Sequence, residues 1–262
     1  MIEALTAAWT DPFNAPVVIF PDPKLEQWFR LRWMKKKGVL ANLNKSTIDR
    51  FLFDILVGND DSQKKLTAEM LTNVILAYLE TDNNYKKLCS EGDDEVTRYL
   101  EVAGKLDYNH LFDFASKMAS LFLDYETSRP AGFVTGKEGF LDKWKQGVSE
   151  KEGLFFTETK ETLELREKWQ RKLYSAIFHK QGNEKEQSLL DQVFEKEAKR
   201  RDENRKYNTI PYLFKACDEG NFNLDKLPKG DDGKTLPIFI FGLSGMGQFY
   251  RVILQKYAEQ HN

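Results

Sequence analysis

The feature that most constrains the fold is a short apolar run, Val17–Phe20, which ends at a Pro-Asp-Pro turn. Four consecutive apolar residues of this kind are typical of a strand that is buried on both faces of a parallel sheet. In the turn, Asp22 can cap a following helix, and Pro23 suits the first helical position because the N–H that it lacks has no partner there. The run therefore predicts a strand followed at once by a helix.

The predicted helix ends at Lys35–Gly38, where three cations lie at the negative end of the helix dipole and a glycine suits the stop position. The next residues, Val39–Asn42, are expected to form a second short buried strand. Ser46–Asp49 resembles a capping box in which aspartate replaces the usual glutamate, and it predicts the start of another helix.

A second apolar run, Pro237–Phe241, has the same character as the first. Between the two runs, apolar residues recur mostly at helical spacing, and one long helix is expected to end at Arg129-Pro130. This order predicts an α/β fold, with a parallel-sheet domain formed by residues 1–60 plus 235–262 and a mainly helical insertion at 61–234. Within it, the segment Lys64–Glu219 is expected to pack as a subdomain around Phe112, Phe122 and Trp169.

Composition narrows the class of protein. The chain has 262 residues, 41% of them apolar, and a formal net charge of −2, so overall basicity does not indicate a nucleic-acid-binding protein. Two cysteines, Cys89 and Cys217, in a chain of this length suggest a reducing compartment without a disulfide framework. Neither a membrane span nor a signal peptide is evident, and we expect a cytoplasmic protein.

The glycine-rich run Gly242–Gln248 follows a predicted strand and opens a predicted helix, which is the right context for a phosphate-binding loop. The required side chains are absent, because Gln248 and Phe249 stand where a Walker loop has lysine and then serine or threonine. Met246 stands where a nucleophile elbow has glycine. No carboxylate follows Phe241 to hold Mg²⁺. We therefore expect a tight turn and no ATP hydrolysis, with a small-molecule enzyme as a minor alternative.

Other catalytic sites are also not indicated. The three histidines, His110, His179 and His261, are far apart and have no partner at metal-ligand spacing. The carboxylates lie in runs of mixed charge and do not suggest a general acid–base pair. We expect no catalytic residue, no metal and no cofactor, and we expect His110 to be a surface or cap residue.

A nucleic-acid signal is confined to the predicted helix that begins at Pro23. Basic residues alternate there with Trp28 and Trp33, and this combination suits phosphate neutralisation with base stacking. The alternative is a solvated helix face whose tryptophans lie in the core. The basic residues are Arg30, Arg32, Lys35, Lys36 and Lys37.

Three blocks of residues occur in an order and spacing that suggest a known family. The first block is Asp11-Pro12-Phe13, then Gln27-Trp28, Gly38-x-x-Ala41-Asn42 and Phe51-x-x-Asp54. The others are Leu121-Phe122-x-x-Tyr125-x-x-x-Arg129-Pro130, with Trp144 downstream, and Ile238–Ser244. Together they resemble the amino-terminal region of RecC, the gamma subunit of the exodeoxyribonuclease V helicase–nuclease. RecC chains are several times longer, so the resemblance implies an amino-terminal fragment.

The resemblance implies a degenerate helicase-like sheet of the P-loop NTPase type that has lost its motor chemistry. The implied function is a non-catalytic scaffold that handles DNA ends and Chi recognition in double-strand break repair. The implied partners are single-stranded and forked DNA and the RecB-like and RecD-like subunits. The alternative is a helical protein-interaction domain without direct DNA contact.

At the positions that the resemblance implies for DNA contact, some residues are of the same kind as in the family and others are different. Gln27, Leu121 and Arg129 match in kind, whereas Pro21, Pro23, Thr47 and Phe53 occupy contact positions with a different residue. Ser120 and Leu123 replace aspartates, so the base code is expected to differ. We predict that DNA passes the carboxyl edge of the Val17 and Val39 strands. Beside that path we place Gln27, Lys36, Phe53 and Arg129.

Overall fold

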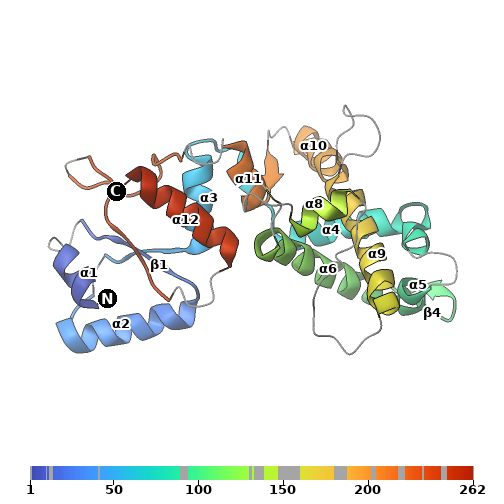
Figure 1. Cartoon of the computed structure of the whole chain (residues 1–262), viewed down its shortest axis with the longest axis horizontal. Helices are drawn as coiled ribbons and strands as arrows, with labels where there is room; N and C mark the ends of the chain where they lie inside the picture. Colours follow the sequence, from blue (N-terminus) through green and yellow to red (C-terminus); the bar gives the residue numbers. More distant parts are fainter. Residues whose placement is uncertain are drawn as a thin grey trace. The chain divides into compact units, whose positions relative to one another are not determined.

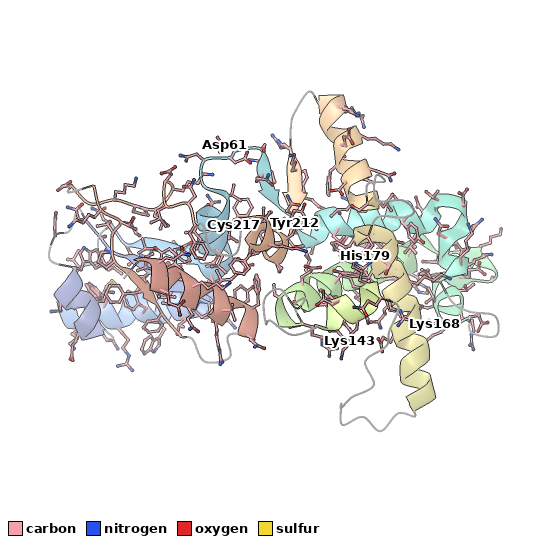
Figure 2. The ribbon with its side chains drawn as sticks, turned by 45° about the horizontal axis from the view of Figure 1, so that its top comes forward. Asp61, Lys143, Lys168, His179, Tyr212 and Cys217 are labelled. Carbon is pink, nitrogen blue, oxygen red and sulfur yellow. The ribbon has the colours of Figure 1, made fainter. Side chains whose placement is uncertain are left out.

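The computed structural model describes the chain except residues 1, 10, 12, 13, 41, 89–93, 130, 131, 133–138, 147–159, 180–187, 202–204, 218–221, 232, 243–246 and 262. The described chain is α/β, with a small parallel sheet and mostly helical content. It divides into two units, one formed by residues 1–61 with 212–262 and the other by 62–211. Asp61 and Tyr212, labelled in Figure 2, are the residues of the first unit at which the chain leaves and returns. Residues 212–234 lie in this first unit, whereas the sequence pattern had suggested that they belong to the insertion.

The first unit, called here the sheet unit, contains three parallel strands in the order β2-β1-β7. Its strands are β1 (Val17–Phe20), β2 (Asn44–Thr47) and β7 (Ile238–Ile240). Its helices are α1 (Ile2–Ala8), α2 (Pro23–Lys37), α3 (Ile48–Val57) and α12 (Gln248–His261), together with most of α11 (Ile210–Ala216).

Helices cover both faces of the sheet, with α1 and α2 on one side of β1 and α3 and α12 on the other (Figure 1). The alternation of side chains along a strand explains this arrangement. Val18 and Phe20 face α2 and pack against Phe29 and Trp33. Ile238 and Ile240 line a hollow on the other face with residues of α3 and α12. The fully apolar β1 is therefore buried on both faces, as predicted.

The predicted second strand at 39–42 is wrong, because the strand is β2, at Asn44–Thr47. Gly38 ends α2 with a φ of 82°, and Val39 after it is 75% exposed. The Val39 carbonyl accepts a hydrogen bond from Trp33 Nε1 at 3.0 Å, which holds this segment against the helix and away from the sheet ladder. The actual strand is polar because it is an edge strand with alternating exposure, a pattern that a search for apolar runs does not detect.

The second unit, called here the helical unit, has one large core formed by helices that pack around α4 and α6. Its helices are α4 (Ala68–Glu80), the 3-10 helix η1 (Thr81–Lys87), α5 (Glu95–Leu100), α6 (Tyr108–Ser128), α8 (Phe140–Lys145), α9 (Lys160–Phe178) and α10 (Leu189–Arg201). Its short strands pair as β3 (Gln63–Lys65) with β6 (Lys206–Asn208), and β4 (Glu101–Val102) with β5 (Lys105–Leu106).

Two of the three residues predicted for this core are buried. Phe122 and Trp169 belong to the core, but Phe112 is 57% exposed. The buried face of α6 runs through Leu111, Ala115 and Phe122, and Phe112 is rotated about 100° from Leu111, toward solvent. Phe114 occupies the aromatic place that was expected for Phe112, in contact with Trp169 at 5.6 Å between ring centroids.

Candidate functional site

The carboxyl edge of the three-stranded sheet is the place where the structure gathers helix starts. Because β1, β2 and β7 are parallel, their carboxyl ends lie along one edge. Helices α2 and α3 begin within a few residues of the strands β1 and β2, and α12 begins eight residues after β7. The first turns of helices present backbone N–H groups without helical partners, so this edge is where an α/β sheet usually receives ligands.

The predicted cap of α2 and the predicted start of α3 are confirmed, but the cap of α3 is Thr47 and not the Ser46 of the expected capping box. The Asp22 carboxylate accepts a hydrogen bond from the Leu25 N–H at 2.9 Å, and Pro23 occupies the first position of α2. The Thr47 hydroxyl accepts from the Arg50 N–H at 3.3 Å at the start of α3. Tyr250 of α12 donates to Asp49 of α3 at 2.8 Å, which ties two of these helices together.

The glycine after β7 is required by its surroundings. Gly242 has a φ of 73°, and a Cβ atom there would lie 2.6 Å from Leu25 Cδ2. Any other residue would be strained in this conformation and would crowd α2. The rest of the glycine-rich run singled out in the sequence, residues 243–246, lies outside the described residues.

The tryptophans of α2 have opposite environments. Trp33 is 6% exposed and belongs to the core, whereas Trp28 is 45% exposed. Trp28 lies at a shallow hollow of about 380 Å³ at the carboxyl edge. The sequence is compatible with a nucleic-acid surface or a core role for both residues, and only Trp33 is a core residue. The hollow is lined by Asp22, Lys24, Leu25, Trp28 and Phe241.

The basic residues of α2 differ in whether they form ion pairs. Arg30 and Lys45 both bind the Glu26 carboxylate at 2.8 Å, and the hydrogen bond from Lys45 is the main cause that lowers the pKa of Glu26. Lys36 pairs with Glu3 of α1 at 2.7 Å and lowers the pKa of that carboxyl group. Among the described residues, no ion pair is seen for the remaining exposed cations of α2. These are Lys24, Arg32, Lys35 and Lys37.

The structure separates some of the residues predicted for DNA contact. Gln27 is exposed in the second turn of α2 and lies near the carboxyl edge. Pro21, Pro23 and Thr47 are also exposed near this edge. Lys36 lies near the other end of α2, about 20 Å from Pro23 at 1.5 Å per residue. Phe53 lies six residues into α3 and is half-buried.

Leu121 and Arg129 belong to the helical unit. Leu121 is partly buried against the core. Arg129 follows the last turn of α6, and its guanidinium lies over the rings of Tyr125, at 5.2 Å, and Phe140, at 4.8 Å. These cation–π contacts give Arg129 a structural partner within its own unit. The spacing of Tyr125 and Arg129, one helical turn apart, is a signal that sequence reasoning could have used.

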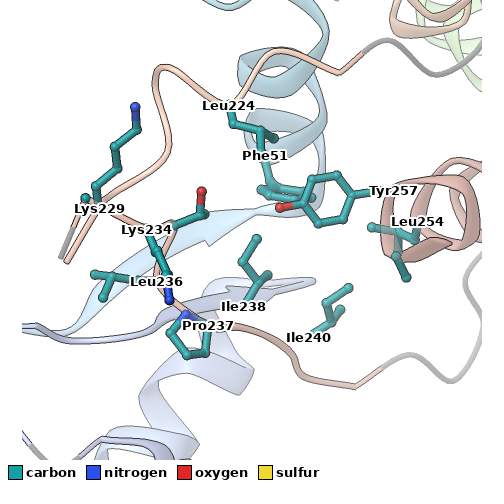
Figure 3. A pocket seen from close by; sticks show the side chains of 13 residues that line it. Phe51, Leu224, Lys229, Lys234, Leu236, Pro237, Ile238, Ile240, Leu254 and Tyr257 are labelled. Atoms are coloured by element: carbon teal, nitrogen blue, oxygen red, sulfur yellow. The ribbon is translucent and has the colours of Figure 1, made fainter. Parts of the chain in front are cut away.

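A second hollow, of about 650 Å³, lies beside β7 on the face opposite α2 (Figure 3). The rings of Phe51 and Tyr257 meet there edge to face at 5.5 Å between centroids. Ile238 and Ile240 of β7 form one wall, and the described part of the lining includes no acidic residue. This chemistry suits an apolar group and offers no acid–base pair. The rim carries two cations, Lys229 and Lys234.

Two histidines, His110 and His179, are candidates for catalysis or metal binding outside the two hollows. His110 is exposed in the first turn of α6, as expected of a surface or cap residue. Its ring nitrogen Nδ1 lies 2.9 Å from the carbonyl oxygen of Tyr99 in α5. Burial lowers the pKa of His179, labelled in Figure 2. Within the described part of the chain, no group of three or more His, Cys, Asp or Glu side chains could hold a metal ion.

Two sequence expectations concern wider properties of the chain. Cys217 is half-buried, and Cys89 lies outside the described residues. Among the helices that the structure describes, none combines the length and the apolar content needed to cross a bilayer.

Comparison with known proteins identifies one family. A family model described as "RecC, N-terminal domain" matches residues 1–262, the whole chain. A search of curated proteins finds no match. The family match agrees with the resemblance seen in the three blocks of sequence.

Proposed function

Because the chain belongs to the RecC family as its N-terminal domain, we propose that it is a DNA-binding scaffold without a catalytic site of its own. Family membership implies a role in the RecBCD complex, with RecB and RecD as partner subunits. In that complex the scaffold handles DNA ends and takes part in Chi recognition during double-strand break repair in the cytoplasm. The observation that carries the proposal is the carboxyl edge of a parallel sheet, with helix starts beside it, in a chain that matches this family throughout.

The proposed ancestry of the sheet unit is a helicase-like domain of the P-loop NTPase type that has lost its motor. Parallel strands with helices on both faces and a glycine two residues after β7 support it. Gln248 and Phe249 stand where the motor residues are needed, and Phe249 is fully buried near Phe214. A buried phenylalanine cannot replace a hydroxyl that holds Mg²⁺. We expect no DNA-stimulated ATP hydrolysis. Turnover that co-purifies with the chain and disappears when Gly242 is mutated would contradict this.

The proposed DNA contacts begin at the carboxyl edge. Gln27 offers an exposed amide that can pair with a base edge, adenine in particular. Phe53 and the helix starts at Pro23 and Thr47 lie on the same unit, while Leu121 and Arg129 are proposed contacts on the helical unit. Lys36 is proposed to bind phosphate, although its ion pair with Glu3 has to be broken or shared for that.

Binding of labelled single-stranded and forked DNA to the whole chain tests this function. We expect Gln27→Ala to change the order of preferred sequences while overall affinity stays nearly intact, because base contacts specify and phosphate contacts position. Gln255→Ala is the matched control, since Gln255 is an exposed glutamine on α12. An unchanged sequence preference in Gln27→Ala would remove Gln27 from the site, and no binding by the wild-type chain would refute DNA binding altogether.

A second candidate function is a protein-interaction domain without DNA contact, and the edge of β7 with which no described strand pairs favours it. Val17 N–H donates to the Pro237 carbonyl and Phe241 N–H to the Ile19 carbonyl, each at 2.9 Å. In a parallel strand the groups of alternate residues point the same way, so those of Ile238 and Ile240 point away from β1. Within the described ranges no strand pairs with that edge, and the apolar hollow lies beside it. Co-purification with a RecB-like subunit and no DNA binding would favour this function.

A further inference from the structure

The hollow beside Trp28 combines features that point to a specific kind of ligand. It lies where β1 and β7 end, and its volume is about 380 Å³. Trp28 leaves 45% of its surface open to solvent at this place. A large aromatic side chain that borders a hollow gains free energy when a flat apolar group covers it. Leu25 and Phe241, both half-buried, continue the apolar lining.

The aromatic lining is held in position. The rings of Trp28 and Phe241 are 5.9 Å apart between centroids and inclined at 45°. The guanidinium of Arg32, one turn further along α2, lies 5.4 Å from the centroid of the Trp28 ring. This cation–π contact restricts the motion of an otherwise exposed side chain. The two rings therefore form a prepared surface for a flat ligand.

The polar lining selects the chemistry of that ligand. Asp22 uses one carboxylate oxygen to cap α2 through the Leu25 N–H, and a carboxylate has further acceptor positions. A carboxylate repels a phosphate but accepts hydrogen bonds from N–H groups. Lys24 lines the same hollow, and Arg32 lies beside it; both are exposed cations that can contact anionic groups just outside. A flat group with N–H donors, linked to anions on either side, is a base within a nucleic acid strand.

We infer that this hollow binds one unstacked base of a single DNA strand, and specifically a base with an exocyclic amino group. The inference rests on the proposed function. Trp28 and Phe241 contact the face of the base, Asp22 accepts from its amino group, and Lys24 and Arg32 contact the flanking phosphates. Cytosine and adenine carry such an amino group, whereas thymine presents a carbonyl oxygen at the corresponding position and would face the carboxylate of Asp22.

Fluorescence anisotropy with labelled oligo(dC), oligo(dA) and oligo(dT) and the whole chain tests the inference. We expect tighter binding of oligo(dC) and oligo(dA) than of oligo(dT). Trp28→Ala should weaken binding roughly 10-fold, and Trp28→Phe should retain most of the affinity because it keeps a stacking ring. Asp22→Asn should reduce the preference over oligo(dT) while the helix stays capped, because asparagine caps as well as aspartate. Leu31→Ala is the control, since Leu31 is an exposed residue of α2 outside the hollow.

The outcomes separate this inference from the proposed function. If the wild-type chain binds these strands and the Trp28 and Asp22 variants bind them equally well, the inference is wrong and the function stands. If the wild-type chain binds none of them, both are wrong. If Trp28→Ala keeps DNA binding but loses association with a RecB-like subunit, the hollow receives a protein side chain and the inference is overturned.

Discussion

Glu126 of α6 is a carboxyl group inside the helical unit whose partners are neutral. Hydroxyl groups of Tyr174 and Thr209 donate hydrogen bonds to it, the second at 3.3 Å. Burial raises the pKa of Glu126, and the two hydrogen bonds only partly oppose this. Burial and the nearby Glu126 carboxyl likewise raise the pKa of Tyr174 well above its ordinary value, and Asp142 adds to this. This cluster was not detectable in the sequence, because its members are 35 to 83 residues apart and no motif connects them.

The raised pKa of Glu126 predicts a pH dependence. A group whose pKa is higher in the folded state stabilises folding below its unfolded pKa, and this contribution is lost as pH rises through the folded pKa. We therefore expect Glu126→Gln to be more stable than the wild type at neutral pH, by on the order of 1 kcal/mol, with this gain disappearing in acid. Denaturant unfolding at pH 5 and pH 8 measures it. Asp124→Asn, an exposed carboxylate on the same helix, is the control. Equal pH dependence in Glu126→Gln and wild type would contradict this account.

The contrast between Phe112 and Phe122 gives a second prediction at this scale. Both are phenylalanines on α6, but Phe122 is fully buried and Phe112 is 57% exposed. We expect Phe122→Ala to lower the free energy of unfolding by about 3–5 kcal/mol, because it leaves a cavity in the core. Phe112→Ala should change it by less than about 0.5 kcal/mol, since it removes no buried contact. A similar loss of unfolding free energy in both variants would contradict this prediction, because it would mean that Phe112 is also buried.

At the scale of elements, the sequence predicts those whose formation depends on local chemistry. The α2 helix has its cap at Asp22 and its stop at Gly38, and both are where the residues predict them. The fully apolar strands β1 and β7 were predicted because an unbroken apolar run is itself a local signal for a buried strand. The polar strands β2, β3 and β6 were not, because their formation depends on partners distant in sequence and not on an apolar pattern.

The turn after β7 gives a prediction for an element boundary. Gly242 and Gly233 have φ values of 73° and 76°, but of these two glycines only Gly242 would bring a Cβ atom within 4 Å of a neighbour, most closely Leu25. Each substitution to alanine should cost about 1–2 kcal/mol for the left-handed conformation. Gly242→Ala should cost more than Gly233→Ala, and the excess should disappear in a Leu25→Ala background. Thermal unfolding of these variants measures the coupling. If Gly242→Ala still costs more than Gly233→Ala in the Leu25→Ala background, the extra cost comes from a contact other than Leu25.

At the scale of the whole molecule, the sequence supported the family and the presence of an α/β region with helical residues inserted in it. The structure places Gln27 and Thr47 near the carboxyl edge of the sheet, whereas Lys36 lies far from it. The sequence places Lys36 in a basic run, and helix geometry then carries it about 20 Å from the helix start. The sequence does not show that Trp28 is exposed and Trp33 is buried, because exposure is a property of the packed fold.

The measurement that tests the central claim most directly is the salt dependence of single-stranded DNA binding by the whole chain. The cations of α2 without an ion pair among the described residues, Lys24, Arg32, Lys35 and Lys37, lead us to expect two to four phosphate contacts. The logarithm of the binding constant should then fall with the logarithm of salt concentration with a slope of about −1.4 to −2.8, at about −0.7 per contact. Lys24→Ala should reduce the slope by about 0.7, and Lys36→Ala should reduce it less because Lys36 is paired with Glu3. Binding that is absent at low salt, or that does not change with salt, would contradict the account.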